Sequence, residues 1–214
     1  VLPFFEASFG QSNVSASGRI LNAVEYYFID EPLNGEFNIS SSFIDLHELA
    51  NIETQSTIED TASNIVADTV YSEGNTSPLI EIPVNISFNL NCKLDTIEYN
   101  EMNLKNTLCQ LSLKNGKTSI VNLSTNALGG KIKADGNYFV TNKNKGAINM
   151  NFRMKNISIE DCSKQLIAIQ KLAPVTTFCE GKLNTSFSLI TEINNQLSPI
   201  INTINSSGQL TTQN

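Results

Sequence analysis

The chain offers few residues for chemistry, beginning with a single histidine, His47, within the segment Asp45-Leu46-His47-Glu48. As a general base it would need a nucleophile and an orienting carboxylate close in space. Nothing in the sequence selects these partners, so we interpret His47 as a surface residue near a helical turn. One histidine also argues against a His-rich metal site.

The four cysteines are the other reactive groups, and two of them are predicted to pair across strands. Cys92 and Cys109 are equally far from a predicted turn between Tyr99 and Met102, which places them directly opposite each other on the apolar face of a hairpin. A cross-strand disulfide is geometrically allowed there, and an oxidising compartment would permit it. Two buried thiols acting as small apolar side chains are the alternative.

The other two cysteines, Cys162 and Cys179, flank a predicted helix and its exit and could also meet. A zinc site made from four cysteines needs close pairs such as C-x-x-C, and the sequence has none. G-x-S-x-G, P-loop and G-x-G-x-x-G motifs are absent too. We therefore expect no enzyme, no metal and no cofactor; a glycoside-type hydrolase, which needs paired carboxylates in a cleft, is a distant third hypothesis.

Charge is unevenly distributed over the 214 residues, whose net charge is −7. Residues 1–90 hold 13 acids and one base, Arg19, whereas residues 91–214 hold 8 acids and 13 bases. Only one base of the second part is an arginine, Arg153, and arginine is favoured for bidentate contacts to bases and phosphates. We therefore expect no nucleic-acid partner and interpret the split as solvated faces of opposite sign.

The elements that would position these residues are mostly β-strands. Apolar residues occupy every second position from Val84 to Leu94 and again from Ile148 to Met154, with polar residues between them. This alternation is typical of a strand with one wet and one dry face. Further strands are expected over 14–16, 33–40, 104–113, 120–127, 132–134, 138–141, 181–189 and 209–212. Short polar turns between them predict an antiparallel meander.

Three signals are expected to separate these strands. Asn115-Gly116 is a hairpin turn signal, Gly129-Gly130 breaks a strand, and Asp135-Gly136 separates the short strand at 132–134 from the one at 138–141.

Two helical pieces are predicted in the last third of the chain. A capping box at 158–161 begins a helix that carries Cys162, Leu166, Ile169 and Ala173 on one face and ends at Pro174. An amphipathic pattern over 192–206, kinked near Pro199 and ended by Gly208, predicts the second helix.

The first third is less regular. A short helix is expected after Gly18, and one or two helical turns at 45–50. Residues 51–79 are polar and acidic and lack periodicity, which predicts a mobile loop. We therefore expect a single domain over 1–214, mainly β with a few short helices (α+β): a curved antiparallel β-meander with helices partly covering its apolar face.

No stretch approaches the roughly 18 apolar residues that a transmembrane helix needs. The chain begins at Val1 without a methionine and without a signal-peptide pattern. We expect a fragment of a longer protein, with any anchor or export signal outside it.

Several phrases taken together resemble the AsmA family of Gram-negative envelope proteins. They lie at residues 12–22, 33–46, 82–88, 129–136, 179–183, 197–204 and 208–210, together with Tyr99 and the pair Ala173-Pro174. In order and spacing they look like the C-terminal AsmA-like region of the type seen in Bacteroidetes. The resemblance covers nearly the whole chain.

The resemblance implies a non-enzymatic protein anchored in the inner membrane and facing the periplasm. Such proteins, related to the TamB-like proteins, carry a long curved sheet and are linked to outer-membrane biogenesis and to lipid transport along an apolar groove. Phospholipid or another lipid, and envelope assembly proteins, are the implied partners. The alternative is a secreted or cell-surface β-rich binding or adhesion module.

A sheet with one apolar face must close into a barrel, pack on helices or leave a groove. We expect the predicted helices to cover this face only in part, which would leave a groove for an acyl chain. Full coverage by helices 158–173 and 192–206, which would make an ordinary core, is the alternative. The groove candidates are Val84, Ile86, Phe88, Leu90, Leu94, Ile148, Met150, Phe152 and Met154.

Overall fold

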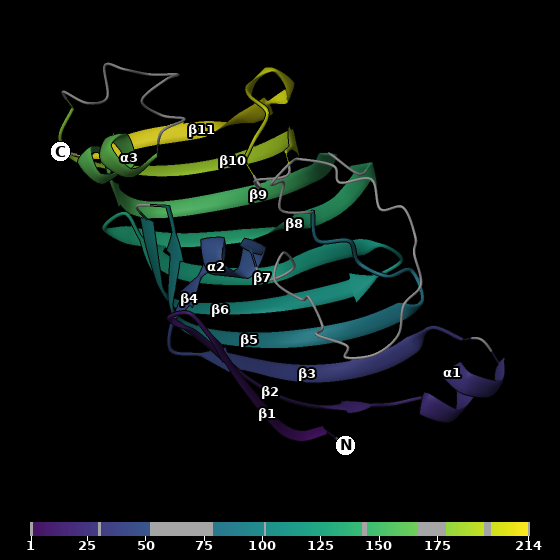
Figure 1. Ribbon diagram of the computed structural model, residues 1–214. Coiled ribbons are helices and arrows are strands. Elements are labelled where there is room, and N and C mark those ends of the chain that lie inside the picture. The colour runs from purple at the N-terminus through teal and green to yellow at the C-terminus, as the bar shows by residue number, and fades with distance from the viewer. Residues whose placement is uncertain are drawn as a thin grey trace, which may run out of the picture.

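The computed structural model describes residues 2–29, 31–51, 79–100, 102–142, 145–166, 179–194 and 198–213, and its strands form one open, curved sheet (Figure 1). The sheet has 11 strands in the order β1-β2-β3-β5-β6-β7-β8-β9-β10-β11, with β4 paired to β5 off this path. Spatial order thus follows chain order along the whole sheet.

The strands are β1 Leu2–Phe9, β2 Ser12–Ile20, β3 Leu33–Ser41, β4 Ile44–Asp45, β5 Ile86–Tyr99, β6 Met102–Lys114, β7 Lys117–Ala127, β8 Gly130–Asn142, β9 Lys145–Ser158, β10 Lys182–Ile193 and β11 Asn205–Gln213. The helical pieces are α1 Ala23–Ile29, α2 Leu46–Asn51, α3 Ile159–Gln165 and the 3₁₀ turn η3 Ile201–Thr203. The expectation of a mainly β chain with a few short helices is confirmed.

The sheet is mixed rather than wholly antiparallel. From β5 to β11 every neighbouring pair is antiparallel, as the meander predicts. The prediction is wrong at β5, which pairs in parallel with β3 and β4. Parallel neighbours need a long crossover, and β3 and β5 are far enough apart in the chain to allow it. In Figure 1, β4 and α2 lie in front of the sheet, on its hollow side.

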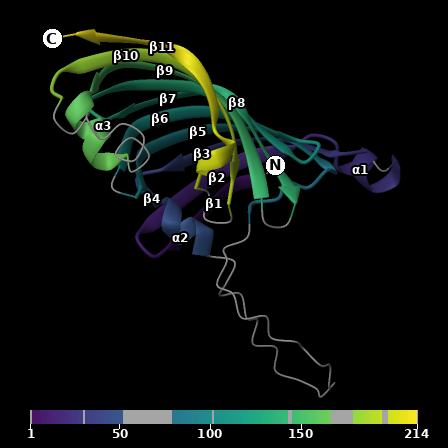
Figure 2. The same ribbon diagram turned by 90° about the horizontal axis from the view of Figure 1, so that it is seen from above.

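The strands bend into an arch when seen from above (Figure 2). The pairing registers shift within β6–β7, β7–β8 and β9–β10. Asn106 and Asn156 lie at two of these irregularities with φ of 53° and 56°. Asparagine tolerates this left-handed region better than most residues, and a bulge bends its strand and increases the local twist. These irregularities account for local bends in the sheet.

Two hairpin turns have the left-handed backbone that a tight hairpin requires. Asn115 and Gly116 have φ of 53° and 74°, so the predicted turn signal is confirmed. The next turn falls on Leu128 and Gly129, with φ of 53° and 72°, and Gly130 already belongs to β8. The predicted strand break at Gly129-Gly130 is therefore displaced by one residue.

Asp135-Gly136 does not separate two strands, contrary to the prediction, because β8 runs unbroken from Gly130 to Asn142. A Cβ atom at Gly136 would collide with the carbonyl oxygen of Asn149 and would lie 2.6 Å from the Met150 Sδ. Gly136 therefore allows β9 to pack closely against β8, and it does not form a turn.

A compact core lies at one end of the sheet, where α3 packs on it. Buried Ala127, Leu128, Ile132 and Ile157 cluster with Cys162 of α3. The Ser158 side chain accepts a hydrogen bond from the Asp161 backbone N–H at 3.1 Å, as the predicted capping box requires. The described helix ends at Gln165, and the predicted positions Ile169 and Ala173 lie outside the described residues.

The predicted helix over 192–206 is wrong. β10 continues to Ile193, and the chain then folds back so that the Ile200 N–H donates to the Glu192 carbonyl oxygen at 2.9 Å. Among the described residues of this segment, 192–194 and 198–206, only η3 is helical, and Gly208 lies within β11 instead of ending a helix.

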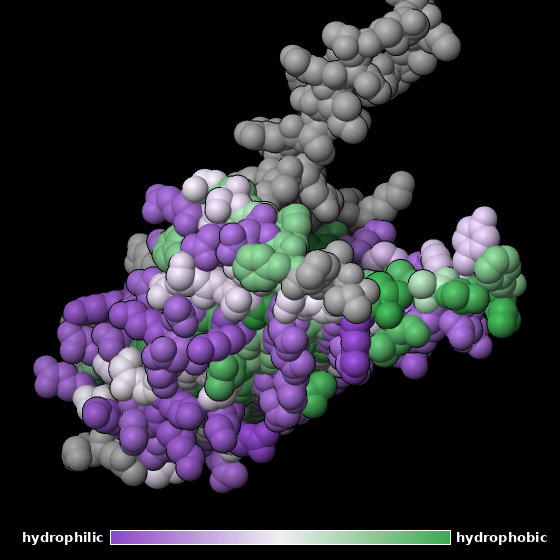
Figure 3. Space-filling view, turned by 90° about the horizontal axis from the view of Figure 1, so that it is seen from below, coloured by the Kyte–Doolittle hydropathy of each residue, from purple (hydrophilic) through white to green (hydrophobic). Residues whose placement is uncertain are grey.

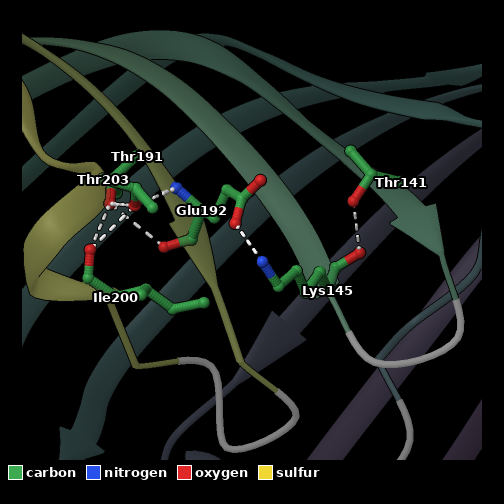
Figure 4. A network of polar contacts seen from close by, with 6 residues as sticks. All are labelled: Thr141, Lys145, Thr191, Glu192, Ile200 and Thr203. Atoms are coloured by element: carbon green, nitrogen blue, oxygen red, sulfur yellow. Dashed lines mark hydrogen bonds and ion pairs between the residues drawn. The ribbon is translucent and has the colours of Figure 1, made fainter.

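Two threonine hydroxyls, one buried on Thr191 and one half-buried on Thr203, hold this return loop (Figure 4). The Thr203 Oγ1 atom lies 2.9 Å from the Thr191 Oγ1, accepts from the Glu192 N–H at 2.9 Å and donates to the Ile200 carbonyl oxygen at 2.7 Å. The Lys145 ammonium is 2.7 Å from the Glu192 carboxylate and ties β9 to β10 beside it. Satisfied backbone groups in the loop take the place of helical hydrogen bonds.

In the first third, α1 and α2 confirm the expected short helix after Gly18 and the turns at 45–50. Most of the predicted mobile loop lies outside the described residues, which resume at Leu79. Leu79 itself is buried.

The loop network predicts a measurable loss of stability in Thr203→Val. The variant keeps the side-chain shape but leaves the Glu192 N–H and the Thr191 hydroxyl without this partner, which costs about 1–3 kcal/mol. Urea unfolding followed by circular dichroism measures the change. Thr211→Val, at an exposed position of β11, is the matched control and should change the unfolding free energy by less than about 0.5 kcal/mol. Equal effects of the two variants would contradict this role of Thr203.

Candidate functional site

The candidate site is the apolar side of the sheet, which we call the inner face and define by residues paired directly across strands. Direct partners lie on the same side of a sheet. One row crosses all ten strands of the main path: Phe5, Ala16, Ile39, Cys92, Cys109, Leu123, Ala134, Phe152, Phe187 and Gly208. None of its members is a charged side chain.

Neighbouring rows extend the same face. One contains Gly18, Phe37, Leu90, Leu111, Ile120, Gly136, Met150, Leu189 and Ser206. On one side of these rows lie Phe88, Leu113, Thr118, Tyr138, Ile148 and Thr191, and on the other lie Leu94, Thr107, Thr125, Ile132, Met154, Thr185 and Leu210. The apolar alternation of single strands therefore becomes a continuous surface.

The register brings together the two groups of groove candidates, which come from strands separated by β6, β7 and β8. Leu90 and Met150 lie in one row, and Leu94 and Met154 in another. Phe88, Ile148 and Phe152 lie on the same face, and Ile86 begins β5 two residues before Phe88. At roughly 4.8 Å per strand, β5 and β9 are about 19 Å apart.

Val84 does not belong to this face, because it lies in the turn before β5 and its side chain is 72% exposed. Conversely, Phe37, Leu111, Leu123 and Phe187 were not among the groove candidates, although they stand in the same rows. The alternation within their own strands is the signal that could have found them.

Aromatic residues pack closely on glycines near both edges of the inner face, and over Gly18 the contact is with a ring. A Cβ atom at Gly18 would collide with the Phe37 ring, and one at Gly208 would collide with Phe187. Phe37 meets Phe88 edge to face at 5.2 Å, and Phe187 stacks on Phe152 at 5.0 Å between ring centroids. Rings over strand glycines protect backbone that would otherwise be wet, and they help to fix the register.

The inner face is buried unevenly among the described residues. At the end covered by α3, Ile132 is buried and Met154 packs against the core cluster. Nearer the centre, Phe88, Leu90 and Leu111 are half-buried. Of the described helices, α3 packs through Cys162 on the cluster at this end, and the predicted helix over 192–206 is absent from the described residues.

Several polar groups of the inner face are paired. The hydroxyls of Thr107 and Thr125, both buried, lie 2.8 Å apart. The Tyr138 hydroxyl donates to the Ile80 carbonyl oxygen at 3.0 Å, and burial raises the pKa of Tyr138. Such groups are satisfied within the protein, so they leave the apolar character of the face unchanged.

Cys92 and Cys109 are direct register partners, which confirms their predicted opposition, and both are free thiols in the structure. Burial, followed by the neighbouring Cys92, raises the pKa of Cys109 to about 12, and burial raises the pKa of Cys92. Burial also raises the pKa of Cys162 to about 11. Since the thiolate is the reactive form, these cysteines act as small apolar side chains.

His47 lies at the surface, as interpreted from its sequence. Its Nε2 atom is 2.9 Å from the Asn100 Oδ1, and its ring stacks on Tyr99. The adjacent Glu48 accepts hydrogen bonds from the backbone N–H groups of Gln11 and Ser12, and the Ser12 hydroxyl also donates to it. These bonds lower the pKa of Glu48, and they join α2 to the β1–β2 turn rather than forming a catalytic group.

Within the described part of the chain, no three histidine, cysteine or acidic side chains gather as metal ligands. No helix in that part combines the length and apolar composition required to cross a bilayer. Comparisons with protein-family models, curated proteins and solved structures found no match to this chain. The resemblance to the AsmA family stays a prediction from the sequence.

The raised thiol pKa values predict slow alkylation of the native protein. At pH 8.5, iodoacetamide should label Cys109 and Cys162 at least tenfold more slowly in the folded than in the urea-unfolded protein, because their thiolates are scarce and shielded. Mass spectrometry of peptides gives the labelled positions. Rapid native labelling of Cys109, or a Cys92–Cys109 disulfide in the purified protein, would contradict this assignment.

The raised pKa of Cys109 also makes the free energy of unfolding depend on pH. Unfolded cysteine loses its proton near pH 8.5, whereas folded Cys109 keeps it up to about pH 12. The unfolded state therefore binds fewer protons in this window, so the unfolding free energy should fall as pH rises from about 8.5 toward 12. Cys109→Ala should flatten that fall relative to the parent protein, as measured by urea unfolding at several pH values.

Proposed function

We propose that this chain is a non-enzymatic envelope protein whose inner face holds the acyl chains of phospholipid or another lipid. The observation that carries the proposal is the row from Phe5 to Gly208, which crosses ten strands without a charged side chain. Acyl chains are long and apolar, and apolar surface gains free energy when it leaves water. A continuous strip of this kind suits them better than a compact ligand.

The place of this function is proposed from the AsmA resemblance. We propose that the chain works on the periplasmic side of the inner membrane of a Gram-negative bacterium, held by an anchor in a longer protein. There it takes part in outer-membrane biogenesis or in lipid transport between the two membranes. The sheet supports a conduit because both of its edges, β1 and β11, end the strand order without closing it into a barrel.

The alternative of a cell-surface adhesion module receives less support. A packed two-sheet sandwich would favour it, and the described strands form one sheet only.

Lipid binding predicts that the purified protein carries lipid. Extraction into organic solvent followed by mass spectrometry should detect bound phospholipid or fatty acid near one equivalent per chain. The protein should also quench or shift a fluorescent phospholipid with saturable binding. A lipid-free protein that fails to bind the fluorescent probe would overturn the proposal for this chain.

Neighbouring residues on opposite faces provide the matched variants. Leu90→Ser removes half-buried apolar surface from the inner face, and should weaken binding of the fluorescent phospholipid roughly fivefold, equivalent to about 1 kcal/mol. Asn89→Ser introduces a serine at the adjacent exposed position and should leave the affinity for the fluorescent phospholipid unchanged. Circular dichroism checks that both variants fold. Equal affinities of the two folded variants would argue against the inner face as the site.

A further inference from the structure

A cavity of about 770 Å³ lies at the end of the sheet where β7 turns into β8, beside α3. It is separate from the central inner face, and the inner-face function makes no use of it. Four lysines from four different strands line it: Lys105, Lys131, Lys155 and Lys182. Asp161 is the one carboxylate among its lining residues, so the lining carries a formal charge of +3.

The pairing register gathers three of these lysines into a line. Lys105 pairs with Asn126, Asn126 with Lys131, and Lys131 with Lys155. Lys131 and Lys155 each neighbour an inner-face residue on their own strands, so they lie on the opposite, outer face. The three lysines therefore span three strand spacings, about 14 Å.

This arrangement costs stability as it stands. Lys131 is directly opposite Lys155, and like charges in direct cross-strand pairs are destabilising. The ion pairs found among the described residues use Arg19, Lys145, Arg153 and Lys164, and none uses a lysine of the cavity. Asp161 is the one carboxylate of the lining, so a bound anion would further reduce the repulsion among the four lysines.

We propose that this cavity binds a phosphate-bearing anion. Lysine ammonium groups are strongly hydrated point charges that commonly bind phosphate, and side-chain amides of Asn103, Asn126 and Asn156 beside them supply further donors. The volume exceeds that of one phosphate and suits a phosphorylated headgroup or a small phosphate ester. The site is independent of acyl-chain binding on the inner face.

The test uses the full chain at low ionic strength, with glycerol 3-phosphate as one probe and phosphatidylcholine vesicles with or without phosphatidic acid as the other. Calorimetry with the soluble ester and flotation with the vesicles measure binding. Binding of the ester identifies a site for soluble phosphates. Binding to the phosphatidic acid vesicles alone identifies a lipid headgroup as the source of the phosphate. Either result supports the proposal when the variants below behave as expected.

The chain provides a closely matched control. Lys131→Gln with Lys155→Gln removes the opposed pair in the cavity, and should weaken phosphate binding at least tenfold while raising the melting temperature. Lys114→Gln with Lys117→Gln removes another opposed pair, at the far end of β6 and β7 and outside this cavity, and should keep the affinity. Equal losses in both double variants, meaning general attraction to basic surface, would overturn the proposal, as would no binding to either probe by the parent protein. Loss of acyl-chain binding on the inner face with phosphate binding intact would leave this site standing.

Discussion

The structure depends on one constraint: a single sheet must keep ten strands in register while one of its faces is apolar from edge to edge. No second sheet faces it among the described residues. A slip of one residue would turn every apolar side chain to the opposite side, so the face itself opposes slippage. Several local features help to fix this register. They are the left-handed turns at Asn115-Gly116 and Leu128-Gly129, the bulges at Asn106 and Asn156, and the aromatic residues packed on glycines near the edges of the sheet. The α1 helix lies outside this system, and Figure 3 shows its apolar side chains at the right, exposed on the surface.

The sequence predicted what is local and failed where distant parts of the chain decide. Alternation along β5 and β9 identified both strands, and counting from one turn placed Cys92 opposite Cys109. The parallel pairing of β3 with β5 has no local signal, because it depends on where a long crossover returns the chain. The pattern over 192–206 has helical spacing, yet its first part lies in a strand and its last part in another. The hydroxyls of Thr191 and Thr203 satisfy backbone groups of the loop between them, and no periodicity of apolar residues detects such bonds.

The candidate sites also combine local features that the sequence predicts with long-range pairings that it does not predict. The apolar residues of β5 and β9 could be assigned to one face each, but their common rows depend on four successive pairing registers, and three of these contain shifts. The opposition of Lys131 and Lys155 is hidden for the same reason, since 24 positions separate them in the chain. A binding site on a sheet is formed by side chains from several paired strands. Its residues can therefore be grouped only when the pairing registers are known.

The fold distributes the uneven charge of the sequence along the sheet. Because strand order follows chain order, the described acids Glu6 and Glu36 lie in β1 and β3 with Glu25 in the adjoining α1, and most of the bases of the second part lie in β6 to β10. The surface potential therefore changes sign along the sheet, and an anion is attracted to the lysine end and repelled from the other. The inner face carries no charge in its central rows, so this polarity acts from the outer face and the strand ends. Added salt would weaken the attraction of an anion to the lysines and leave apolar binding on the inner face in place.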